Sequence, residues 1–183
     1  MNHITIICGR SGAGKGTLCS YLCEKVDGLI WKPSLLTGKV LDEFDIPNTR
    51  ENLSNMMQVL RSEFTEDIYI HAARAYIEKH PNTPLFFDGI RKIHFIKKLQ
   101  EIEKCTIIYV DAALQIRYER LSNRWEKLTE SSMTFEQFLS DESLESEAEN
   151  EMIRNMADRV IENTSTKEDL YESIEWALFS WDK

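Results

Sequence analysis

The chain has 183 residues and a formal net charge of −9, with 31 acidic side chains against 22 lysines and arginines. This excess of negative charge repels polyanions and excludes nucleic acid as an expected main partner. Hydrophobic residues make up 42% of the chain, but no apolar run approaches the roughly 18 residues needed to cross a bilayer. We therefore expect one globular domain over residues 1–183, cytoplasmic and without a membrane partner.

A glycine-rich segment follows the first predicted strand, residues 3–8, and precedes a predicted helix at residues 15–26. Gly9, Gly14 and Lys15 have the spacing Gly-x-x-x-x-Gly-Lys of a phosphate-binding loop, in which successive backbone N–H groups converge on an oxyanion. The positive N-terminal end of the helix points to the same place. The alternative is a turn that binds nothing. We expect the loop to bind ATP through Gly9, Gly12, Ala13, Gly14, Lys15, Gly16 and Thr17.

The residue after the lysine decides which kind of phosphate-binding loop this is. Gly16 stands where a hydroxyl group usually binds Mg²⁺, and the hydroxyl group comes one residue later in Thr17. We expect Mg²⁺ to take its oxygens from water and from the substrate phosphates. The sequence Gly-Lys-Gly-Thr resembles the loop of adenylate kinases and other nucleoside monophosphate kinases more than the Gly-Lys-Ser-Thr of dephospho-CoA kinases.

Several helices without a strong strand between them follow a short extended piece at residues 28–32. They are predicted at residues 35–44, 49–62 and 64–79. Residues 33–80 therefore form an insertion, and in a kinase of the kind that the loop resembles, this insertion would bind the phosphate acceptor. Its candidate ligands for the acceptor's phosphate are Arg50 and Arg61.

Asp88 ends a predicted buried strand at residues 84–88 and begins the sequence Asp-Gly-Ile-Arg. P-loop enzymes hold Mg²⁺ with such a carboxylate, so Asp88 is the candidate metal ligand. Arg91 would bind a phosphate, in catalysis or in acceptor binding. The alternative is that Asp88 only caps the helix predicted at residues 91–103. The segment resembles the Asp-Gly-Phe-Pro-Arg of adenylate kinases, shortened by one residue, and the Asp-Gly-x-Arg of archaeal dephospho-CoA-kinase-like enzymes.

A second group of arginines follows Asp111, after the strand predicted at residues 105–110. Arg117, Arg120 and Arg124 lie on neighbouring turns of one predicted helix. Arg120 and Arg124 match the Arg-x-x-x-Arg at the base of the lid in nucleoside monophosphate kinases, which implies that they neutralise charge on the transferred phosphoryl group. The alternative is an exposed face of salt bridges to neighbouring glutamates.

The last third of the chain contains an acidic stretch and a closing strand. Residues 127–153 have acidic side chains and no basic one between Lys127 and Arg154, which indicates either a lid or a solvated helical face. The segment from Ala157 to Asn163 resembles the closing segment of dephospho-CoA kinases. The resemblance implies that Asn163 lies near the base of the bound nucleotide; without it, Asn163 is a turn residue.

Alternating strands and helices predict a three-layer α/β P-loop fold, with a five-stranded parallel sheet covered by helices on both faces. Ligands bind beyond the carboxyl ends of such strands, where the loops after residues 8, 88 and 111 converge. The resemblance implies an enzyme that moves the γ-phosphoryl group of ATP·Mg²⁺ to a nucleoside or deoxynucleoside monophosphate. A dephospho-CoA-kinase-like enzyme is the alternative, and a nucleotide-binding switch or adaptor is the alternative of another class.

Overall fold

The computed structural model describes residues 3–123, 134–144 and 147–178. The strands are β1 (Ile4–Cys8), β2 (Leu29–Trp31), β3 (Leu85–Asp88), β4 (Cys105–Asp111) and β5 (Arg159–Glu162). The helices are α1 (Lys15–Lys25), α2 (Pro33–Glu43), α3 (Arg50–Glu63), α4 (Ile68–Lys79), α5 (Ile93–Ile102), α6 (Leu114–Ser122), α7 (Phe135–Leu144), α8 (Glu147–Met156) and α9 (Lys167–Leu178). The order of elements agrees with the order predicted from the sequence.

The strands form one parallel sheet in the order β2-β3-β1-β4-β5. Strand β1 lies at the centre, where Ile4 pairs with Leu85 of β3 on one side and with Cys105 of β4 on the other. From β1 the chain forms β2 and β3 on one side of this strand and then β4 and β5 on the other, so the loop after β1 lies at the point where a parallel sheet opens a crevice for ligands. The predicted sheet is thereby confirmed.

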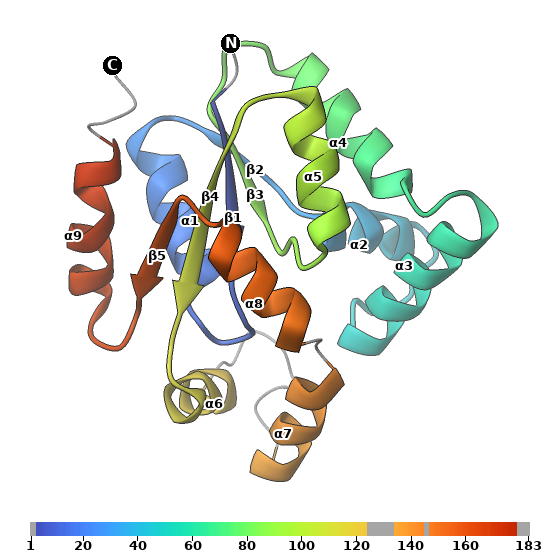
Figure 1. Ribbon diagram of the computed structural model, residues 1–183. Coiled ribbons are helices and arrows are strands. Elements are labelled where there is room, and N and C mark those ends of the chain that lie inside the picture. Colours follow the sequence, from blue (N-terminus) through green and yellow to red (C-terminus); the bar gives the residue numbers. More distant parts are fainter. Residues whose placement is uncertain (1–2, 124–133, 145–146, 179–183) are drawn as a thin grey trace.

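Helices cover both faces of this sheet (Figure 1). On one face, Leu18 and Leu22 of α1 pack with Leu170 and Ile174 of α9. The opposite face is covered by α4, α5 and α8. The central strands are therefore buried on both sides, which explains why their sequences are continuous apolar runs.

The helices between β2 and β3 have two different roles. Helix α4 buries Tyr69, Ile70, Ala73 and Ile77 in the core, whereas α3 has no buried residue. Helix α3 therefore stands out from the sheet and packs against α2, which buries Pro33, Thr37, Gly38 and Leu41. These two helices form a wall beside the carboxyl ends of the strands.

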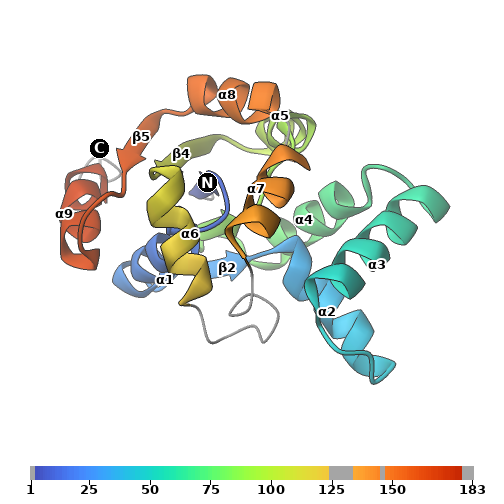
Figure 2. The ribbon, with the colours of Figure 1, turned by 90° about the horizontal axis from the view of Figure 1, so that it is seen from below.

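Two further helices, α6 and α7, lie at the carboxyl ends of the strands (Figure 2). They are joined by an aromatic contact, because the Phe138 ring of α7 is 1% exposed and its centroid lies 5.6 Å from that of Tyr118 in α6. Among the described residues, no helix is long and apolar enough to cross a membrane.

Candidate active site

The loop between β1 and α1 bends sharply because its glycines adopt backbone angles that other residues avoid. The φ angles are +133° at Gly9, +77° at Gly12 and +101° at Gly14. A Cβ atom at Gly12 would lie 2.5 Å from the carbonyl oxygen of Arg117, and one at Gly14 would collide with the side chain of Asn163. The loop is thus held close to α6 and to the end of β5, in the curled form that lets backbone N–H groups face an oxyanion.

Lys15 begins α1, directly after this loop. Its Nζ atom donates a hydrogen bond to the carbonyl oxygen of Arg10 over 2.7 Å. The first turn of α1 contains no acidic side chain, so no carboxylate of that turn offsets the positive helix end. The glycine loop, the ammonium group and the helix end together fit the phosphates of ATP.

Asp88 lies at the carboxyl end of β3, where the sequence predicts it, and its side chain is 8% exposed. Its Oδ2 atom forms an ion pair of 2.6 Å with Nζ of Lys32, which follows β2 directly. A Cβ atom built on Gly16 would lie 3.8 Å from this oxygen, so the carboxylate faces the first turn of α1. This arrangement fits Mg²⁺ that takes one ligand from Asp88, directly or through water, and the others from phosphates and water.

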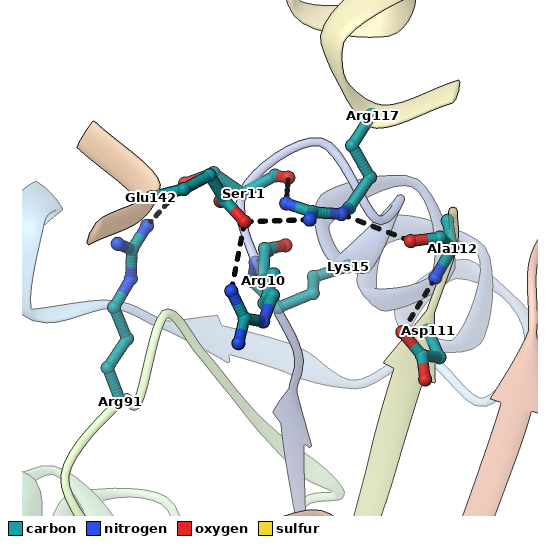
Figure 3. Close-up of polar contacts among 8 residues, drawn as sticks. All are labelled: Arg10, Ser11, Lys15, Arg91, Asp111, Ala112, Arg117 and Glu142. Carbon is teal, nitrogen blue, oxygen red and sulfur yellow. Dashed lines mark hydrogen bonds and ion pairs between the residues drawn. The ribbon is translucent and has the colours of Figure 1, made fainter. Parts of the chain in front are cut away.

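A buried cluster of charges joins the loop to α6 and α7. Oε2 of Glu142 accepts hydrogen bonds from Nη1 of Arg10 over 3.0 Å and from Nη2 of Arg117 over 2.7 Å. Arg117 also donates from Nε to the carbonyl oxygen of Ala112 and from Nη1 to that of Ser11. Figure 3 shows Arg117 reaching the loop from α6 and Arg91 reaching it from the loop after β3.

The surroundings of Glu142 favour its charged form. Burial alone would raise the pKa of Glu142, but hydrogen bonds from Arg117 and Arg10 and their positive charges outweigh burial and lower it. The side chains of Arg117 and Glu142 are 4% and 8% exposed. In the described residues 134–144, the acidic stretch is therefore not a fully solvated face, since Phe138 and Glu142 are both buried.

Arg120 connects the loop after β5 to α6. Its guanidinium donates to the carbonyl oxygen and Oδ1 of Asn163 and to the carbonyl oxygen of Ser165. Asn163 is 5% exposed and donates from Nδ2 to the carbonyl oxygen of Ala13 over 2.8 Å. The structure therefore places Asn163 against the phosphate loop, and Arg120 binds Asn163 and the segment that follows it. Arg124, the second residue of the predicted pair, and residues 127–133 and 145–146 of the predicted lid lie outside the described residues.

A cavity of about 760 Å³ lies between the phosphate loop and the wall formed by α2 and α3. It is lined by the cationic side chains of Arg50, Arg61, Arg91 and Lys92. The acidic side chain of Glu66 also lines it. Ser11 also lines it, and its Oγ atom is 3.0 Å from Nη2 of Arg91. The structure thus brings the three predicted acceptor-side arginines to one cavity.

An aromatic contact positions Arg61 at this cavity. Its guanidinium carbon lies 5.4 Å from the centre of the Tyr69 ring, a distance suited to a cation–π contact. The Tyr69 hydroxyl group in turn lies 2.6 Å from Oγ1 of Thr37, so α2, α3 and α4 all contribute to the position of Arg61.

Three residues of this region carry no clear signal in the sequence. Arg10 occupies a variable position of the loop motif, and Glu142 is one carboxylate in a long acidic stretch. Lys32 gives a weak signal, because it follows a strand directly and precedes Pro33 at the start of a helix. Only the folded chain shows that these residues lie against the phosphate loop or its metal-ligand candidate.

Comparisons with known proteins agree with this arrangement. A UPF0200 protein of Sulfurisphaera tokodaii is 29% identical over 176 residues, which cover 96% of this chain and 95% of that protein. Among solved structures, TT1252 from Thermus thermophilus has a TM-score of 0.63 at 19% identity and covers 98% of this chain and 97% of its own. Shikimate kinase from Bacteroides thetaiotaomicron has a TM-score of 0.64 at 11% identity and covers 99% of both chains.

These structural similarities establish that the fold is that of P-loop kinases. The prediction of a P-loop architecture is confirmed at this level, and the narrower assignment to nucleoside monophosphate kinases stays a prediction. A family model described as an AAA domain matches residues 5–150, which include the phosphate loop and the residues of the cationic cavity. By this match over most of its length, the chain belongs to the AAA domain family.

Proposed function

We propose that this protein is an ATP-dependent phosphotransferase whose acceptor is a nucleoside or deoxynucleoside monophosphate. The observation that carries the proposal is that the phosphate loop and the cationic cavity share a lining residue, Ser11. Ser11 belongs to the phosphate loop and also lines the cationic cavity, where it is bonded to Arg91. A donor phosphate in the loop and an acceptor phosphate in the cavity would therefore face each other, as direct transfer requires.

Different residues of the chain would bind the donor and the acceptor. The loop N–H groups and Lys15 would bind the β- and γ-phosphates of ATP, and Arg91 would contact the group in transfer. Mg²⁺ near Asp88 would neutralise phosphate charge. The transfer depends mainly on positioning and on electrostatic stabilisation, which these groups supply without covalent chemistry.

The acceptor side favours a small anionic molecule. The volume of the cationic cavity, about 760 Å³, lies within the range of small-molecule sites. The arginines at the cavity present planar guanidinium groups, which suit a phosphate group. The cavity also contains Gln58 and Ser54, whose polar groups could distinguish one base from another.

The test is an assay of ADP release with ATP and a panel of ribo- and deoxynucleoside monophosphates, with dephospho-CoA included. We expect ADP release to depend on one or a few of the monophosphates. The Arg61→Ala variant should raise the KM for that acceptor by about 10- to 100-fold, because it removes a charge-assisted contact of roughly 1.5–3 kcal/mol. Arg74→Ala is the matched control, because Arg74 is exposed on α4 and should leave the KM unchanged.

Each alternative predicts a different result in the same assay. Turnover with dephospho-CoA and with none of the monophosphates would contradict the proposed acceptor and favour the dephospho-CoA-kinase-like alternative. Binding of ATP without acceptor-dependent ADP release would contradict the enzyme and favour a switch or adaptor.

A further inference from the structure

Lys32 lies at the junction of the two sites, although neither the loop motif nor the acceptor wall includes it. It follows the last residue of β2, and the pairing of Trp31 with Phe87 places it beside Asp88 at the edge of the sheet. It also lines a second cavity, of about 670 Å³, which shares Ser34 and Leu53 with the cationic cavity. The ammonium group is therefore near the acceptor wall on one side.

On the other side, the ammonium group approaches the phosphate loop. A Cβ atom built on Gly16 would lie 3.9 Å from Nζ of Lys32 and 3.8 Å from Oδ2 of Asp88. A serine or threonine at position 16 would extend its hydroxyl group toward this ion pair. Because Gly16 has no side chain, Lys32 and Asp88 can occupy the space beside the N-terminal end of α1.

We propose that Lys32 is a second catalytic lysine, which binds the phosphoryl group in transfer together with Lys15. The proposal rests on the proposed function and adds a residue to it. Gly16 removes the hydroxyl group that would hold a metal at this point of the loop, and Lys32 brings a positive charge to the same place. Asp88 holds this ammonium group in position through the 2.6 Å ion pair.

The transfer step requires only hydrogen bonds and a positive charge from Lys32. An oxygen of the acceptor's phosphate forms a bond to the γ-phosphorus of ATP, and the bond from that phosphorus to the bridging oxygen of ADP breaks. The bridging oxygen keeps the electron pair, and a fully ionised acceptor phosphate has no proton to release. Lys32 donates hydrogen bonds to the γ-phosphoryl oxygens throughout, and its charge is worth most in the transition state because the group is partly withdrawn from water.

The experiment compares Lys32→Met with Lys39→Met. Lys39 is exposed and lines the same 670 Å³ cavity, but it lies about two helical turns further along α2. Lys32→Met should lower kcat by about 100-fold or more, as expected for the loss of one preorganised donor. Binding of a fluorescent ATP analogue should change little. The Tm should fall, because Lys32→Met leaves the Asp88 carboxylate buried without its ion-pair partner, so kcat is compared well below the unfolding temperature. Lys32→Arg should recover part of kcat, because it restores the positive charge.

A second comparison separates catalysis from simple neutralisation of Asp88. Lys32→Met should still lower kcat in an Asp88→Asn background, although less than in the wild type, because Asp88 positions the ammonium group. If it has no effect in that background, or if Lys32→Met and Lys39→Met have equal kcat values, the proposal is wrong. Absence of acceptor-dependent turnover in the wild type would overturn the proposed function as well, so the two failures are distinguishable.

Discussion

The buried charge cluster around Glu142 gives a prediction for stability that does not depend on the identity of the substrate. Glu142→Gln keeps the shape of the side chain but removes the charge that two guanidinium groups share. Removing one partner of a buried ion pair costs about 3–5 kcal/mol. The glutamine oxygen can still accept a hydrogen bond, which lowers the expected loss to about 2–3 kcal/mol. In a domain of this size, the Tm should fall by roughly 4–12 °C.

The assay is thermal unfolding followed by circular dichroism, with urea unfolding as a second measure. Glu136→Gln is the control, because Glu136 is an exposed acidic residue in the first turn of the same helix. Its loss should cost at most about 1 kcal/mol through the helix dipole. If Glu142→Gln and Glu136→Gln unfold at the same temperature, Glu142 does not hold α7 against the phosphate loop and the reasoning fails.

Three further predictions concern the phosphate loop and the charge cluster. Lys15→Ala should lower kcat/KM for ATP by about 100-fold, a loss of about 3 kcal/mol of transition-state stabilisation. The measurement is ADP release, and a wild-type rate would contradict the role of Lys15. Gly14→Ala should destabilise the fold by about 1–3 kcal/mol in urea unfolding, because φ is +101° there and the new methyl group would meet Asn163; an unchanged midpoint would show that the loop can relax. Since the pKa of Glu142 is lowered on folding, its stabilisation is complete above its ordinary pKa and is lost as the pH falls, so the stability difference between the wild type and Glu142→Gln should shrink below about pH 4. A difference that stays constant down to pH 2 would contradict this assignment.

The architecture can be predicted from the sequence, because the information for it is local. Largely apolar runs such as residues 105–110 predict strands buried on both faces, and the helices between them supply the crossover connections that parallel pairing requires. The Gly9–Lys15 spacing identified the phosphate loop, because a loop of that curvature needs glycine at positions where φ is positive. Asp88 and Arg91 were found because the motif places them directly after a strand end.

The side chains that face the phosphate loop cannot be predicted in the same way, because they come from elements far apart in the chain. Glu142 lies 132 residues from Arg10 in the chain, and nothing in the acidic sequence around it distinguishes it from the neighbouring carboxylates. The sequence left Arg117 open between an exposed salt bridge and an inward position, and the packing of α6 against the loop buries it. Lys32 meets Asp88 only because β2 and β3 are neighbours in the sheet. Contacts of this kind depend on how elements far apart in the chain pack together, and a local pattern of residue types does not contain that information.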